Sequence, residues 1–175
     1  ALGEVAVLIS DQKYNDARQS LRRALDAVHD DLELHNRYHK LLMLLDDNTA
    51  LANHADYLVE LHMAQHQTAR AVGVVLDVQT RLASFKLGKS STALALAQLM
   101  VEQGYYRNGI RLLHNFHAQY PNDRHLPAAY LLAATTLIEH LGDDKTGRNI
   151  ARYTLKKHPN CKEHIALEKL LNISV

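Results

Sequence analysis

The sequence predicts an all-α fold, in which about ten helices pair into antiparallel hairpins that stack as a solenoid. Three observations lead to this prediction. Apolar residues recur at intervals of three and four along most of the 175 positions, as they do on the buried face of an amphipathic helix. Proline, which breaks helices, first occurs at Pro121. A pattern of glycine, small and proline residues repeats after 38 positions, a period typical of stacked helical hairpins.

Five helices are expected in the first half of the chain. Leu21 and Ala24 share an apolar face of the second of them, which predicts one buried side. Short polar clusters separate the first four segments, and their oxygen-bearing side chains can accept hydrogen bonds from the first turn of a helix. We expect Asp31 and Asn48 to be such N-caps. The predicted helices are residues 2–10, 14–29, 32–45, 49–63 and 65–87.

Five more helices are expected in the second half. Gly88 is predicted to end the preceding helix, and Ser91 and Asn160 are predicted to cap the helices that follow them. The last segment is apolar, with Leu167 among its residues, and we expect it to cover the end of the solenoid. The predicted helices are residues 92–102, 105–120, 126–141, 145–158 and 161–171.

An internal repeat relates two of these hairpins. A shift of 38 residues places Gly104 on Gly142, Gly109 on Gly147, and Pro121 on Pro159. We expect the first glycine of each copy to adopt the positive φ of a tight turn. The second glycine would let the paired helices approach closely, and the proline would end the second helix. Residues 13–17 begin a weaker third copy.

The repeated residues resemble the tetratricopeptide repeat (TPR) family. In the best copy the matching residues, in the family's order, are Leu96, Ala97, Gly104, Tyr106, Gly109, Leu113, Phe116 and Pro121. The second copy matches at Gly142, Gly147, Ala151, Thr154 and Pro159, and the third at Tyr14, Ala17, Leu21 and Ala24. The family's tryptophan is absent, and glycine replaces its alanine at positions 109 and 147.

This resemblance implies one right-handed superhelical domain over residues 1–175, with degenerate hairpins in 1–87 and clearer repeats in 88–175. It also implies a concave groove that binds a protein or peptide partner, without catalysis or a cofactor. The polar residues expected to line the groove are Glu33, Asn36, Lys40, Gln98, Glu102, His125 and Thr136. Exposure to solvent alone explains these positions equally well. The part from Thr92 onward is also similar to repeat domains of bacterial envelope-associated proteins, which implies a piece of a larger bacterial protein.

A basic face offers an alternative function. Two ladders of basic residues follow equivalent helices of the two repeats and should lie side by side. Their members are Arg107, Arg111, Arg148, Arg152 and Lys156. Such a face could contact nucleic acid or an anionic membrane surface. The overall balance of 20 Lys and Arg against 19 Asp and Glu, a net charge of +1, favours a solvated outer face instead.

Catalytic and metal-binding signals are weak. The twelve histidines include the pairs 35/39, 62/66 and 114/117, whose spacing can place two imidazoles on one helix face. No His-Glu-x-x-His motif occurs, so we expect structural histidines and no metal; a histidine-metal enzyme is the least favoured alternative. Gly88-Lys89-Ser90 lacks the earlier glycine of a P-loop. Cys161 is the single cysteine, so no internal disulfide forms and a cysteine-built zinc finger is excluded.

Composition narrows the remaining classes. With 47% hydrophobic and 22% charged residues, the chain can bury a core and is not disordered. No apolar stretch approaches 18 residues, so we expect no transmembrane segment. We expect a cytoplasmic protein or the soluble domain of a membrane-associated one. The chain begins at Ala1 rather than Met, so we expect its first helix to be completed upstream or by a second copy.

Overall fold

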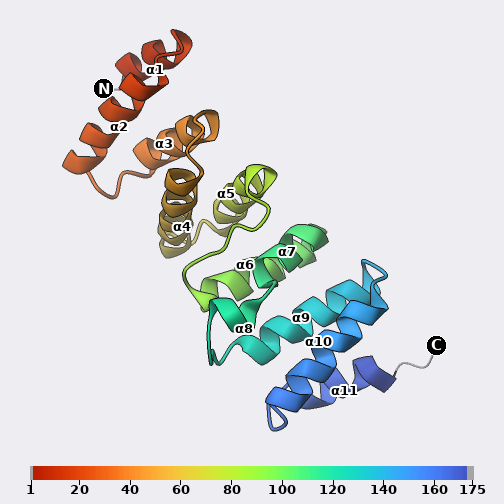
Figure 1. Cartoon of the computed structure of the whole chain (residues 1–175). Helices are drawn as coiled ribbons and strands as arrows, with labels where there is room; N and C mark the ends of the chain where they lie inside the picture. The colour runs from red at the N-terminus through yellow and green to blue at the C-terminus, as the bar shows by residue number, and fades with distance from the viewer. Residues whose placement is uncertain (1, 173–175) are drawn as a thin grey trace. The chain divides into compact units, whose positions relative to one another are not determined.

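The computed structural model describes residues 2–172, and this part of the chain is entirely helical (Figure 1). It contains eleven helices and no strand, which confirms the predicted all-α class. The helices are α1 Leu2–Ser10, α2 Tyr14–Ala27, α3 Leu32–Leu44, α4 Asn48–Ala64, α5 Thr68–Arg81, α6 Ser90–Glu102, α7 Tyr106–Leu113, α8 Phe116–Gln119, α9 Leu126–Glu139, α10 Asp144–Lys157 and α11 His164–Asn172.

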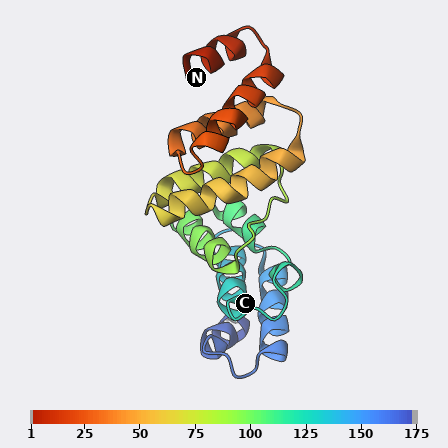
Figure 2. The same cartoon turned by 90° about the vertical axis from the view of Figure 1, so that its left-hand side faces the viewer.

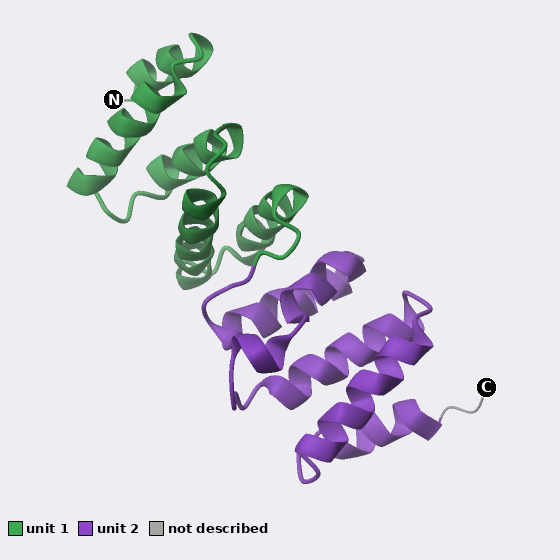
Figure 3. Cartoon of the chain, in the orientation of Figure 1, with its two compact units in different colours: residues 1–85 green, residues 86–175 purple. Residues whose placement is uncertain are grey.

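The chain divides into two compact units, residues 1–85 and residues 86–175 (Figure 3). The first unit contains α1 to α5, and the second contains α6 to α11. Each unit has its own buried side chains, which include Leu21, Leu41 and Leu58 in the first and Leu96 and Phe116 in the second. Each unit is therefore described by itself.

Four antiparallel hairpins share one kind of turn. The pairs are α1–α2, α4–α5, α6–α7 and α9–α10, and the last pair lies side by side in both views (Figures 1 and 2). Gly104 and Gly142 have φ of 86° and 67°, as predicted. Gln12 and His66 adopt the same left-handed conformation, with φ of 60° and 56°. His66 stands 38 residues before Gly104, so it begins a copy of the repeat that the sequence pattern did not reveal.

A small residue five positions after each turn lets the paired helices touch. Ala17 and Ala71 are fully buried in the first unit, and Gly109 and Gly147 are buried in the second. A Cβ atom added to Gly109 would lie 3.1 Å from the carbonyl oxygen of Ala97. This confirms the prediction that the second glycine of each copy permits close approach.

Two helices stand outside the hairpin pattern. α3 packs between α2 and α4 in the first unit. α11 packs on α10 and α9, where Leu167 and Leu170 join Ala134 and Ala151 in one apolar cluster. The last helix therefore covers the final hairpin, as predicted, although it begins at His164 rather than at Cys161.

Two long predicted helices are shorter than expected. The segment 65–87 is helical only from Thr68 to Arg81, because His66 turns the chain before it and the Arg81 guanidinium donates to the Leu42 carbonyl near its end. The segment 105–120 breaks after Leu113 into α7 and α8. Asn115 has φ 55° and ψ 34° at the break, a left-handed conformation that asparagine tolerates better than most residues.

The predicted helix caps are partly corrected. Asp31 accepts a hydrogen bond from the Leu34 N–H at 3.0 Å, as expected. Asp47, not Asn48, caps α4 by accepting from the Ala50 N–H at 2.9 Å. Lys89 precedes α6 without a side-chain cap, so Ser91 is not one. Gly88 does not end a helix, since α5 stops at Arg81, and Asn160 lies before the start of α11 and caps nothing.

Candidate functional site

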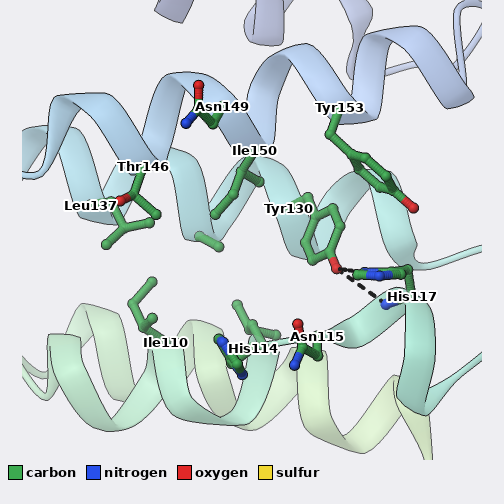
Figure 4. A pocket seen from close by; sticks show the side chains of 12 residues that line it. Ile110, His114, Asn115, His117, Tyr130, Leu137, Thr146, Asn149, Ile150 and Tyr153 are labelled. Atoms are coloured by element: carbon green, nitrogen blue, oxygen red, sulfur yellow. Dashed lines mark hydrogen bonds between the residues drawn. The ribbon is translucent and has the colours of Figure 1, made fainter.

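A cavity of about 340 Å³ opens in the second unit, over α9 and between α7 and α10 (Figure 4). Its walls come from three helices of two successive hairpins, together with the short connection between α7 and α8. The lining residues are Ile110, Leu113, His114, Asn115, His117, Tyr130, Ala133, Leu137, Thr146, Asn149, Ile150 and Tyr153.

The centre of the cavity is apolar. Ile110 of α7 and Ile150 of α10 are half-buried and face each other across the opening (Figure 4). Ala133 of α9 lies at the floor between them, 3% exposed. A small side chain at this floor position leaves space that a larger one would fill. The amphipathic faces of the neighbouring helices thus leave part of their apolar surface uncovered.

One end of the cavity carries aromatic and hydrogen-bonding groups. The Tyr130 hydroxyl bonds the Nδ1 atom of His117 and accepts from the His117 backbone N–H at 3.2 Å. Burial raises the pKa of Tyr130, so this hydroxyl stays neutral at physiological pH. The Tyr153 ring lies 5.2 Å from the His117 ring, centroid to centroid, and 6.0 Å from the Tyr130 ring. The three rings form a polar lip beside the apolar centre.

Lys86 holds the helix break that shapes this lip. Its ammonium group donates to the carbonyl oxygens of Arg111 and of His114, the latter at 2.7 Å. These carbonyls lie at the C-terminal end of α7, where intrahelical partners are missing. Burial lowers the pKa of Lys86 to about 8. The interruption at Asn115 is thus stabilised from a segment that stands 25 or more residues earlier in the chain. No motif around Lys86 indicated this role.

A second hollow adjoins the cavity. It has a volume of about 300 Å³ and shares His117 and Tyr153 with the first. The remaining lining residues are Pro121, Asn122, Leu126, Lys157 and His158. The first hollow is mainly apolar, and the second brings an ammonium group beside the same aromatic lip.

Charge is unevenly divided between the two units. The second unit carries twelve Lys and Arg against seven Asp and Glu, a formal charge of +5. The first carries eight against twelve, a charge of −4. The near-neutral total therefore conceals a basic second unit.

The basic residues predicted from the sequence flank the cavity. Arg107 and Arg111 are exposed on α7, one turn from Ile110 and His114 respectively. On α10, Arg148 is half-buried, and Arg152 and Lys156 are exposed. The Arg152 guanidinium donates to Asn149 Oδ1 of the lining at 3.2 Å.

The residues predicted to line the groove fall in different places. In the first unit, Glu33 and Lys40 line a hollow of about 380 Å³ between α1 and α3. Glu33 is also paired there with Arg37 at 2.8 Å. Asn36 is not part of this hollow; its Oδ1 atom bonds Nε2 of the buried His62 at 3.1 Å.

In the second unit, none of the predicted groove residues lines the cavity. Gln98 and Glu102 are exposed on α6. His125 precedes α9, and its backbone N–H donates to Asp123 Oδ1 at 2.7 Å. Thr136 is only 1% exposed, and its hydroxyl donates to the Leu132 carbonyl at 2.7 Å. Thr136 therefore presents no surface to a partner.

The first unit contains a cluster of imidazoles between α3 and α4. His35 Nδ1 lies 3.1 Å from His54 Nε2, and His35 Nε2 bonds the His29 carbonyl at 2.7 Å. The His39 ring stacks 6.4 Å from His54, and its Nε2 atom lies 3.4 Å from a carboxylate oxygen of Asp77. Desolvation lowers the pKa of His39, and it lowers the pKa of His54 to about 3.

The spacing of the histidine pairs does not translate into metal sites. His62 is buried, whereas His66 stands in the exposed turn after α4. His114 and His117 lie on either side of the break at Asn115 and both line the cavity. Within residues 2–172 no three His, Cys, Asp or Glu side chains are grouped so that they could hold a metal ion.

Comparison with known proteins gives no family. No protein-family model matches the chain, and no curated protein matches it with significant similarity. The TPR resemblance therefore remains a prediction from the repeated residues. Among residues 2–172, no helix is long and apolar enough to cross a membrane.

Proposed function

We propose that the chain is a non-catalytic scaffold that binds a protein or peptide partner, and that the cavity over α9 receives a side chain of that partner. The observation that carries this proposal is the open apolar space between Ile110, Ala133 and Ile150. Uncovered apolar surface in a preformed hollow gains free energy when an apolar group displaces water from it.

The chemistry of the lining supports binding rather than catalysis. The twelve described residues around the cavity include no Asp, Glu or Cys. His117 and Tyr130 are bonded to each other, and no carboxylate in the lining could orient either group as an acid or base. The hairpin packing supports the finer proposal of a TPR-like repeat, since small residues at positions 109 and 147 contact the preceding helix as that family's pattern requires.

Peptides selected from a displayed library test this proposal. We expect selected peptides to bind the chain at one site, measured by isothermal titration calorimetry. The variant Ile110→Ser should weaken binding at least about tenfold, because it removes apolar wall from the cavity. Ile165→Ser is the matched control, since Ile165 is 67% exposed on α11 and does not line the cavity. Equal binding by both variants would place the site elsewhere.

The charge of the second unit supports a second candidate, contact with phosphates of nucleic acid or of an anionic membrane. Arg107, Arg111, Arg152 and Lys156 are exposed for such contact. Phosphate contacts release counterions, so affinity would fall steeply with salt. Titration with duplex DNA and with phosphatidylserine vesicles at increasing salt tests it. Weak binding of both probes near physiological salt would exclude this candidate.

A further inference from the structure

The apolar cavity and the second hollow form one trough. They share His117 and Tyr153, which stand at the same end of the cavity, beside Tyr130 (Figure 4). A ligand that fills the apolar end and extends past these rings reaches Lys157 and His158. The trough therefore changes from apolar to basic along its length.

Negative charge is absent from the described lining of this trough. Neither hollow has Asp or Glu among its lining residues. The nearest carboxylates in sequence are already engaged: Asp123 accepts from the His125 N–H, and Asp143 accepts from the Thr146 N–H at 3.1 Å. Asp143 also marks the start of α10, whereas Lys157 ends it. The acidic and basic groups of α10 thus lie at opposite ends of the trough.

We propose that the partner segment is acidic, with a bulky apolar side chain that fills the cavity and neighbouring carboxylates that lie beside Lys157. This inference rests on the proposed function, because it assigns a ligand chemistry to the same cavity. An apolar anchor gains free energy by leaving water. The carboxylates add attraction toward Lys157 and toward the basic residues on the rims of α7 and α10, which favours fast and specific association.

Three synthetic peptides separate the two parts of the proposal. The first has a Leu-Phe core followed by glutamates, the second replaces the glutamates by glutamines, and the third replaces Leu-Phe by serines. Each is labelled with fluorescein, and its binding to the whole chain is measured by fluorescence anisotropy. We expect the first peptide to bind at least about tenfold more tightly than either of the others.

Charge reversal locates the acidic end. Lys157→Glu should weaken the glutamate peptide at least about tenfold and leave the glutamine peptide unchanged. Lys169→Glu is the matched control, because Lys169 also lies in the last turn of an exposed helix end, on α11, outside the trough. The two variants lose the same favourable charge at a helix C-terminus, so a general effect on stability would appear in both.

The outcomes distinguish this inference from the proposed function. Equal binding of the glutamate and glutamine peptides, with loss of both in Ile110→Ser, overturns the acidic specificity and leaves the scaffold. Equal binding of the serine peptide shows simple attraction of anions and overturns the anchor. Failure of all three peptides, while library-selected peptides bind, also overturns the acidic assignment. Failure of selected peptides as well overturns the proposed function itself.

Discussion

Individual glycines set the spacing of helices within the hairpins. A Cβ atom on Gly147 would stand 2.6 Å from Ile138 Cγ1 and 2.9 Å from the Ala134 carbonyl oxygen. The carbonyl belongs to the backbone of α9 and has no freedom to move aside. Gly73, in contrast, has open space around the same added atom, although it also lies within a helix. Helix propensity and packing therefore act in opposite directions at these two glycines.

Replacing each glycine by alanine should change stability with opposite sign. Gly147→Ala is expected to lower the free energy of unfolding by about 1–3 kcal/mol, because the hairpin must open to admit the methyl group. Gly73→Ala is expected to raise it by up to about 1 kcal/mol, because alanine favours the helix. Urea unfolding followed by circular dichroism measures both. A stabilising Gly147→Ala would contradict the close contact.

Buried histidines make the first unit sensitive to acid. Burial holds the pKa of His39 and of His62 below the ordinary value and lowers that of His54 to about 3. In the unfolded chain these imidazoles take up protons as pH falls through about 6.5. The folded chain takes them up only at lower pH, so acid favours the unfolded state.

We expect the free energy of unfolding to be highest above about pH 7 and to decrease below about pH 6.5, by at most about 1.4 kcal/mol per pH unit for each histidine. For His54 the loss should continue toward pH 3, the region of its folded pKa. Urea unfolding at a series of pH values measures this slope, and His54→Gln should reduce it. His66→Gln, at an exposed turn, is the control. Constant stability between neutral and acidic pH would refute the expectation.

At the scale of helices, local sequence predicted existence and type better than length. The periodic residues correctly predicted helical hairpins around Gly104 and Gly142, since glycine marks the turn there. The hairpin at His66 was missed, because histidine carries no signal for a left-handed turn. The segment 105–120 was predicted as one helix because its apolar period continues, and the break at Asn115 depends on Lys86 from an earlier part of the chain.

Removing this contact should weaken the second unit and its cavity together. Lys86→Met leaves the carbonyls of Arg111 and His114 without their ammonium donor, at a cost of about 1–3 kcal/mol in the free energy of unfolding. Peptide affinity should fall as well, because His114 and Asn115 line the cavity. Denaturation and anisotropy measure the two effects. Lys169→Met is the control, and loss of neither property in Lys86→Met would show that α7 ends without help from Lys86.

At the scale of the whole chain, sequence reasoning predicted the fold class but not the site. Of the predicted site residues, the basic ones flank the cavity, with Arg152 bonded to its lining. The groove residues were chosen as polar positions of the first helix in each hairpin, and none lines it. The cavity combines apolar side chains of three helices with a helix break, and no local pattern encodes such a combination. The opposite charges of the two units were hidden because the sum over the chain is near zero.

The second unit should fold without the first. Residues 86–175 contain α6 to α11, the cluster around Leu167, and the whole lining of both hollows. We expect this fragment to show a helical circular dichroism spectrum and a cooperative thermal transition, since it has its own core. It should also bind the peptides that the whole chain binds. A fragment without a cooperative transition would show that the unit needs residues 1–85.

The recurrence of one turn at His66, Gly104 and Gly142 limits how the gene can change length. Duplication or loss of a whole period restores each turn and its buried small residue, so the new junction repeats an existing one. An insertion of any other length within residues 105–142 moves a bulky side chain to the place where a helix pair admits only glycine or alanine. Natural variants in this stretch should therefore differ by complete hairpins.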